Sequence, residues 1–393
     1  MATADLRITR VVLREFGWTL PGLGLDRSGY EPVYDPASTA RLTGYVLQIE
    51  SAAGVTGEYA WSMGSNAVPA AQIKIAARHL IGRDALQRER IWNELKRHFR
   101  KHDRVGLGPI DIALWDLAGK AFGAPVHQLL GGYRTRLPAY ASTYFGDENG
   151  GLSSPAAYAD FAVRCRELGY RGFKVHGWGG PVAREVATVL ATREAVGPGM
   201  ALMVDPACGY ETFADALAVG RACDEAGCFW YEDPYADGGI SAFGHRKLRE
   251  LIRTPLLLGE HVRGFEAHVD QVLAGGTDFV RADPDLDGGI TGVMKIAHAA
   301  EGLGLDVELH GPGPAHRQCM AAIRNTNFYE LGLVAPGITD KSRHYQVQGP
   351  GYSDDLDAVD AEGCVPVPDG PGLGVTLLED WLAPRVTATL AVD

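Results

Sequence analysis

Lys174 and His176 lie two residues apart in the stretch GFKVHG (172–177), at the end of a short apolar run. Residues i and i+2 of a strand face the same side, so a strand here directs both basic groups at one place. The chain as a whole carries a net charge of −12. Two basic groups converging inside an acidic protein indicate a site that handles a negatively charged species.

Ionisable residues recur at the ends of the apolar runs that follow. Counting from Asp205, the intervals are 27, 28, 23, 27 and 20 residues, about one strand-plus-helix unit each. Ordinary polar residues at the point where a strand meets solvent would explain one or two of them, but not seven in succession. The series consists of Lys174 with His176, Asp205, Glu232, Glu260, Asp283, His310 and Glu330.

The elements that position these residues form a repeating pattern from residue 137 onward. Eight short apolar runs alternate with helical patterns, which predicts a parallel sheet. Eight units favour a (β/α)8 TIM barrel, in which the C-terminal strand ends converge on one mouth where the chemistry takes place. The runs begin at residues 137, 172, 201, 228, 255, 278, 306 and 327, and helical patterns lie at 156–168, 182–195, 212–226, 291–303 and 316–324.

The region before residue 130 has a mixed pattern. It begins with an alternating strand, continues with two strands around a glycine-containing turn at 39–62, and then shows helical patterns at 68–104 and 108–132. These patterns predict an α+β domain.

Asp205, Glu232 and Glu260 are expected on three consecutive strands. Three carboxylates brought together without compensation repel one another and force at least one to take up a proton. A divalent cation removes that conflict, and oxygen ligands suit Mg²⁺, or Mn²⁺ as a substitute. The alternative is that each carboxylate forms a separate surface salt bridge.

Histidine and lysine at the same mouth supply groups for proton transfer. His310, from the seventh strand, is expected across the barrel from Lys174 and His176. Asp283 can accept a hydrogen bond from His310, which fixes the tautomer and raises the basicity of the imidazole. Glu330 would serve as a neutral acid or as a partner of Lys174. Together with a metal, these groups suit abstraction of the weakly acidic proton beside a carboxylate.

Composition limits the other classes of function. The chain has 393 residues, of which 46% are hydrophobic and 22% charged, which is typical of a globular protein. Its acidity argues against a nucleic-acid partner, and no apolar run approaches the roughly 20 residues of a membrane span. The N-terminus lacks the apolar stretch of a signal peptide. Six scattered cysteines without a CxxC pair favour a reducing cytoplasm.

The sequence resembles the enolase superfamily, mandelate racemase subgroup, over nearly the whole chain. FKVH resembles the K-x-K motif of that family, and ELHG and YELG resemble the strands of its catalytic histidine and glutamate. VDP, YEDP and GEH resemble the strand ends that carry its three metal ligands. The other matching stretches are IDIALWDLAGKAFGAPVHQLLGG (110–132), DFVRADPDLDGGITG (278–292) and VPDGPGLGV (367–375).

The resemblance implies a capping domain at 1–132, a barrel at 133–365 and a segment at 366–393 that returns to the cap. Loops at 19–32 and 61–66 would close over the mouth and select a small-molecule carboxylate substrate. A homo-oligomer is also implied. The implied residue roles are metal ligation by Asp205, Glu232 and Glu260, acid/base chemistry by His310 with Asp283, stabilisation of the intermediate by Lys174, and a substrate contact from Glu330.

Two departures from the family pattern affect the reaction. His176 replaces the second lysine of K-x-K; it remains a candidate base, although many relatives without that lysine resemble one-base dehydratases. Ala207 stands where the family often has an asparagine within reach of substrate. His261 follows Glu260 directly, so strand alternation turns it away from the mouth and gives it a packing or loop role.

The leading hypothesis is a lyase, a dehydratase of an aldonate or aldarate that yields a 2-keto-3-deoxy acid. His310 is the preferred acid for the departing hydroxyl, and His176 competes with it as the base. A racemase, an epimerase or a lactone cycloisomerase would share the first half of this reaction. A Schiff-base aldolase acting through Lys174 is a further alternative, and a barrel retained only for binding is the weakest.

Overall fold

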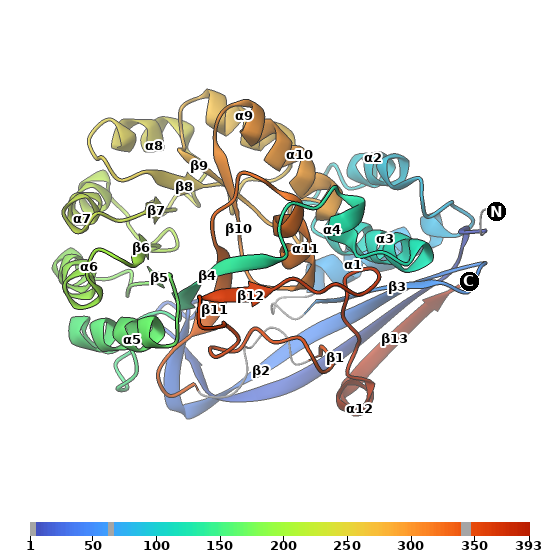
Figure 1. The fold of residues 1–393 in the computed structure, drawn as a ribbon, viewed down its shortest axis with the longest axis horizontal. Coiled ribbons are helices and arrows are strands. Elements are labelled where there is room, and N and C mark those ends of the chain that lie inside the picture. The colour runs from blue at the N-terminus through green and yellow to red at the C-terminus, as the bar shows by residue number, and fades with distance from the viewer. Residues whose placement is uncertain (1–4, 62–66, 339–346) are drawn as a thin grey trace.

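The computed structural model describes residues 5–61, 67–338 and 347–393. Two layers of the molecule are visible in Figure 1: an open antiparallel sheet below and a ring of short strands surrounded by helices above. The antiparallel sheet has the order β13-β1-β2-β3. Its strands are β1 (Ile8–Leu25), β2 (Pro32–Ser51), β3 (Thr56–Trp61) and β13 (Val386–Val392).

The first two strands form a long hairpin. They pair from Ile8 with Ser51 to Leu25 with Pro32, so most of the predicted 19–32 loop continues the strands and only residues 26–31 form the tip. The predicted 61–66 loop falls almost entirely on residues 62–66, which lie outside the described residues.

Helices α1 (Ala67–Leu80), α2 (Arg88–His98), α3 (Leu107–Phe122) and α4 (Val126–Leu129) follow the hairpin. Helix α3 is largely buried. A side chain at Gly57 of β3 would collide with the backbone and side chains of α3, so this glycine permits close packing of helix on strand. Helix α3 also joins the two layers, because Asp111 accepts hydrogen bonds from Thr291 N (2.8 Å) and Thr291 Oγ1 (2.7 Å).

The eight predicted barrel strands are all present. They pair in parallel in the order β10-β9-β8-β7-β6-β5-β4-β11, and the two end strands contact each other. They are β4 (Arg136–Thr143), β5 (Gly172–Val175), β6 (Ala201–Val204), β7 (Trp230–Glu232), β8 (Leu256–Leu258), β9 (Phe279–Ala282), β10 (Asp306–Leu309) and β11 (Tyr329–Val334).

The buried carboxylate of Glu308 connects the two end strands of this order. It accepts hydrogen bonds from the backbone amides of Asn327 (3.0 Å) and Phe328 (3.2 Å), which precede β11. Burial raises the pKa of Glu308 to about 7, and its hydrogen bonds with Asn327 work against that rise.

Helices cover the outside of the barrel (Figure 1). Two of them, α8 and α9, were not among the predicted helical patterns. Ser154, Thr212 and Ser241 each accept a hydrogen bond from a backbone amide in the first turn of the helix that they begin. The helices are α5 (Pro155–Glu167), α6 (Val182–Val196), α7 (Phe213–Ala226), α8 (Ala242–Arg249), α9 (Phe265–Leu273), α10 (Gly289–Gly302) and α11 (Pro314–Ala322).

The C-terminal segment runs from the barrel back to the antiparallel sheet. Strand β12 (Cys364–Pro366) pairs with β4, and β13 pairs with β1 beyond helix α12 (Glu379–Leu382). The boundaries at 132/133 and 365/366 stay predictions.

An apolar layer fills the bottom of the barrel and supports the polar mouth. It consists of Tyr140, Met203, Trp230 and Leu257, each fully buried. Layers of inward-facing side chains are characteristic of a packed (β/α)8 barrel, so the ionisable residues rest on a closed floor.

Candidate active site

A cavity of about 440 Å³ opens at the C-terminal ends of the barrel strands. Six of the eight predicted site residues line it, together with residues from the tip of the β1–β2 hairpin. The lining residues are Tyr30, Glu31, Pro32, Phe145, Lys174, His176, Asp205, Ala207, Cys208, Gly238, Glu260, His261, His310, Gly311, Pro312, Glu330, Gly332 and Leu333.

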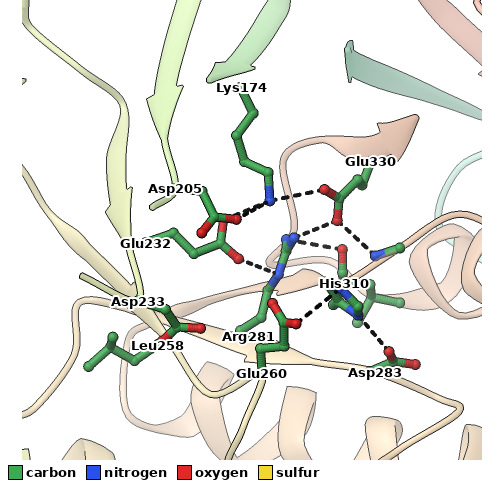
Figure 2. Close-up of polar contacts among 12 residues, drawn as sticks. Lys174, Asp205, Glu232, Asp233, Leu258, Glu260, Arg281, Asp283, His310 and Glu330 are labelled. Atoms are coloured by element: carbon green, nitrogen blue, oxygen red, sulfur yellow. Dashed lines mark hydrogen bonds and ion pairs between the residues drawn. The ribbon is translucent and has the colours of Figure 1, made fainter. Parts of the chain in front are cut away.

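Lys174 lies at the centre of the polar mouth (Figure 2). Its ammonium contacts Asp205 Oδ2 at 2.8 Å, Glu232 Oε2 at 3.0 Å and Glu330 Oε1 at 3.0 Å. Burial alone would lower the pKa of Lys174, but these three carboxylates raise it well above its ordinary value. Lys174 is therefore a fixed positive charge.

Arg281 is a second buried cation, which the sequence reasoning missed. Figure 2 shows its guanidinium between Glu232 and Glu330; Nε lies 2.9 Å from Glu232 Oε1 and an Nη atom 2.5 Å from Glu330 Oε2. The side chain is fully buried. Arg281 lies on β9, two residues before the predicted site residue Asp283. This spacing was the available signal, because alternate residues of an extended chain face the same side.

Glu330 is surrounded by donors. It accepts hydrogen bonds from Arg281 and from the amide of Gly311 (2.7 Å), in addition to the Lys174 contact. Burial opposes ionisation, but Arg281, Lys174 and His310 hold the pKa of Glu330 well below its usual range. The structure therefore favours the role of Lys174 partner over the role of neutral acid.

The three predicted metal ligands reach the same mouth but have different neighbours. Lys174 links Asp205 to Glu232, whereas Glu260 Oε1 faces His310 Nε2 at 3.3 Å. Burial raises the pKa of Glu232 to about 7 despite Arg281. Within the described residues, ligand atoms converge to within 4.8 Å in two other groups: Asp233, Glu260 and His261; and Asp283, Asp285 and His316.

Asp233 provides a test of whether the mouth suits a divalent cation. It is buried, and neither of its carboxylate oxygens accepts a hydrogen bond from the described residues. Burial, with Glu260 and Glu232 nearby, raises the pKa of Asp233 well above its ordinary value. Asp205, Glu232, Asp233 and Glu260 lie at the ends of three consecutive strands, and the two oxygens of Asp233 have no donor in the described part of the chain. These four carboxylates form the oxygen-rich environment that Mg²⁺ prefers.

His310 and Asp283 form a hydrogen-bonded pair. His310 Nδ1 lies 2.7 Å from Asp283 Oδ2, and the remaining ring nitrogen, Nε2, lies toward Glu260. Burial opposes the charge on the imidazole, but Glu260 and Asp283 raise the pKa of His310 to about 9. In this arrangement the imidazole is a proton donor at neutral pH.

His176 converges on Asp205 together with Lys174, as the i, i+2 spacing predicts. Its Nε2 lies 3.0 Å from Asp205 Oδ2 and its Nδ1 lies 2.7 Å from the carbonyl oxygen of Thr143. Phe145 packs on the ring at 4.8 Å between centroids. Both ring nitrogens of His176 thus face oxygen acceptors.

His261 lines the cavity, so the expectation that it turns away from the mouth is wrong. Strand β8 ends at Leu258, and Gly259 has φ of 134°. The backbone changes direction at Gly259, so the alternation of β8 does not continue to residues 260 and 261. Ala207 and Cys208 also line the cavity, and burial raises the pKa of the Cys208 thiol, which keeps it neutral and unreactive.

The architecture defines the class of protein: a (β/α)8 barrel whose polar mouth is covered by an α+β domain. The sequence model described as mandelate racemase / muconate lactonizing enzyme, N-terminal domain, matches residues 31–131, and the one described as enolase C-terminal domain-like matches residues 157–381. The chain belongs to the enolase superfamily, mandelate racemase subgroup.

Individual relatives cover most of the chain. D-galactarolactone cycloisomerase from Agrobacterium fabrum is 32% identical over 349 residues, 86% of this chain and 89% of the relative. L-talarate/galactarate dehydratase from Salmonella typhimurium is 29% identical over 315 residues, 79% of this chain and 73% of the relative. The crystal structure of D-glucarate dehydratase from Agrobacterium tumefaciens complexed with magnesium is 30% identical, with a TM-score of 0.86 over 98% of this chain and all of the other.

No helix in the described ranges 5–61, 67–338 and 347–393 combines the length and apolar character needed to cross a bilayer.

Proposed function

We propose that this chain is a lyase, a Mg²⁺-dependent dehydratase that converts a sugar acid into a 2-keto-3-deoxy acid. The observation that carries the proposal is the His310–Asp283 pair, hydrogen-bonded at 2.7 Å, whose histidine lines the same cavity as the buried Lys174. The names of the dehydratase relatives support the same reaction class.

Asp205, Glu232 and Glu260 are the residues that we propose for holding Mg²⁺, with Mn²⁺ as a substitute. The bound cation would supply Lewis-acid stabilisation of negative charge on the substrate carboxylate. Asp233, with its two oxygens lacking donors, lies directly beside this set.

Lys174 holds a permanent positive charge beside the expected position of the substrate carboxylate. When the α-proton leaves, its electron pair moves into the carboxylate and forms an enediolate, whose added charge lies near this ammonium. A fixed cation in a buried site stabilises such charge without reorganising. Glu330 and Arg281 keep Lys174 in place through the contacts described above.

His310 is the group that we propose for moving the proton. Its neutral imidazole takes the α-proton at Nε2; the resulting imidazolium then gives a proton to the β-hydroxyl, whose C–O bond breaks to release water. Asp283 holds Nδ1 in the protonated form throughout. Glu260 makes the largest contribution to raising the pKa of His310, so metal binding by Glu260 would lower that pKa and favour the neutral form that accepts the proton.

His176 is the competing base. Its two ring nitrogens are directed at Thr143 and Asp205, which favours a role in holding Asp205 over a role in proton transfer.

A substrate screen tests the proposal. Aldonates and aldarates are incubated with the chain and Mg²⁺, in water and in D₂O, and both 2-keto acid formation and deuterium incorporation at C2 are measured. We expect 2-keto acid from at least one acid sugar, and no product after chelation of the metal. Racemisation of a 2-hydroxy acid with no product from any acid sugar would overturn it.

Lactone cycloisomerisation is the second candidate, because the Agrobacterium fabrum relative is named for that reaction. It begins with the same proton abstraction but expels a ring oxygen instead of a hydroxyl. Consumption of a sugar lactone with deuterium incorporation and without loss of water would favour this candidate over dehydration. Racemisation or epimerisation would show exchange at C2 with inversion alone.

The Schiff-base aldolase alternative requires an uncharged Lys174. The three carboxylates around its ammonium keep this lysine charged, and a charged ammonium is not a nucleophile. Borohydride trapping of Lys174 on a carbonyl substrate would reverse this preference.

A small-molecule carboxylate partner, self-association and the absence of nucleic-acid and membrane partners stay predictions.

A further inference from the structure

The tip of the β1–β2 hairpin lines part of the cavity. Tyr30 and Glu31 of the tip, and Pro32 at the start of β2, are lining residues, whereas Lys174 lies buried on β5 within the barrel. A substrate whose carboxylate faces Lys174 therefore extends its other end toward the tip. The chemistry of the tip decides what that end can be.

Glu31 is the acidic residue that the tip contributes to the cavity lining. Its side chain is half-buried. Burial raises the pKa of its carboxyl, and the charge of His176 works in the opposite direction. Asp205 and Glu260 act on Glu31 from the barrel side, so negative charge faces the cavity from above as well as from below.

Hydrogen bonds on both sides of Glu31 fix its position. Within the tip, Asp26 Oδ1 accepts from the amide of Glu31 (3.1 Å), and Asp26 N donates to the carbonyl oxygen of Glu31 (2.8 Å). On the barrel side, the amide of Phe145 donates to the carbonyl oxygen of Pro32 (3.2 Å). Phe145 also packs on His176, so the tip is tied to the residue beneath it.

We propose that Glu31 is a specificity residue that restricts the substrate to sugar acids with one free carboxylate, namely aldonates, anhydro-aldonates or the monolactones of aldarates. Hydroxyl groups at the distal end of such a substrate donate hydrogen bonds to the Glu31 carboxylate. The second carboxylate of an aldarate meets a like charge there and is rejected. This proposal rests on the proposed acid-sugar chemistry and narrows it to one substrate class.

The test uses pairs of acids that match at every stereocentre: D-gluconate with D-glucarate, D-galactonate with galactarate, and D-mannonate with D-mannarate. The kcat/KM of the full chain with Mg²⁺ is measured for each acid from 2-keto acid formation, and exchange at C2 is measured in D₂O. We expect the wild type to favour the aldonate of its best pair by at least about 10-fold.

Glu31→Gln keeps the shape of the side chain but removes its charge. We expect this variant to lose about 10- to 100-fold in kcat/KM on the best aldonate, the range for one charge-assisted hydrogen bond, and to gain on the matched aldarate. Glu211→Gln is the matched control, because Glu211 is exposed and is not among the cavity-lining residues; it should leave both values unchanged.

A wild type that prefers the aldarate, or a Glu31→Gln variant with an unchanged aldonate-to-aldarate ratio, overturns the specificity proposal and leaves the dehydratase proposal intact. A wild type that neither converts nor exchanges any acid sugar of the wider screen, these six acids included, overturns the dehydratase proposal, and the specificity proposal falls with it.

Discussion

At the scale of single residues, the mouth of the barrel separates fixed charges from a movable proton. Lys174, Arg281 and Glu330 hold one another in permanent ionisation. His310 differs, because two carboxylates raise its pKa to about 9. Glu260 faces Nε2 of the ring and Asp283 faces Nδ1. His310 is therefore the residue whose protonation state responds most directly to what the site binds.

Replacing His310 by Asn should lower kcat for 2-keto acid formation by about 10²- to 10⁴-fold, the usual contribution of a general acid or base. Exchange of the α-proton in D₂O should fall with it, because we assign both proton transfers to this residue. His298→Asn, on the exposed face of α10, is the control. Full exchange in His310→Asn would transfer the base role to His176.

The Asp283→Asn variant tests whether Asp283 positions His310 and raises its pKa, and the pH dependence of kcat is the measurement. Asp283 raises the pKa of His310, so its loss lowers that pKa and the imidazolium is lost at a lower pH. The reaction starts from the neutral imidazole, so we expect the acidic limb of the kcat profile to move to lower pH, along with a fall in kcat of about 10- to 100-fold. An unchanged profile with reduced kcat would contradict the electrostatic role.

At the scale of elements, the two layers are joined through a buried acid on α3. Asp111 accepts two hydrogen bonds from Thr291 on α10. Burial nevertheless raises the pKa of Asp111 to about 7, with Thr291 lowering it only in part. The hydrogen bonds fix the geometry of the contact, but they do not offset the loss of hydration.

The consequence for stability follows from proton linkage. The folded pKa of Asp111 lies above its ordinary value of 3.8, so the folded chain binds more protons between about pH 4 and pH 7. The Asp111 contribution to the free energy of unfolding therefore falls as pH rises through this window and is constant above it.

Asp111→Asn keeps hydrogen-bonding groups opposite Thr291 and cannot ionise. Relative to the wild type, it should gain on the order of 1–3 kcal/mol in the free energy of unfolding between pH 5 and pH 8. Urea unfolding at several pH values measures this. Asp103→Asn, at an exposed position, is the control and should show no such trend. If the free energy of unfolding of Asp111→Asn equals that of the wild type at every pH, Asp111 is ionised in the folded chain.

At the scale of the whole molecule, the C-terminal tail holds the sheet that carries the cavity-lining tip. Leu382 of α12 is fully buried in a cluster with Phe16, Trp18 and Val347. Strand β13 then pairs along β1, and β1 leads directly to the tip over the cavity. A loosened tail should therefore affect both stability and catalysis.

Leu382→Ala should cost about 2–5 kcal/mol, the range for truncating a buried leucine, and should expose the nearby Arg385 to trypsin. Thermal unfolding and limited proteolysis measure these effects. Thr389→Ala, on the exposed side of β13, should change stability by no more than about 0.5 kcal/mol. Equal trypsin resistance in both variants would show that the tail is held elsewhere.

Sequence patterns determined the strands of the barrel and the ionisable residue at or near the end of each run from the second onward, because alternation and helical periodicity are local properties of the chain. The short helices α8 and α9 lacked a pattern strong enough to be predicted. The turn of His261 into the cavity depends on where β8 ends, which pairing with its neighbours sets.

Only the tertiary structure decided which charges neutralise one another. Arg281 between Glu232 and Glu330, Lys174 among three carboxylates, and Glu31 above His176 each join segments far apart in the chain. The energies of such contacts depend on distance and burial in the folded state, and a pattern of residue types along one chain contains neither.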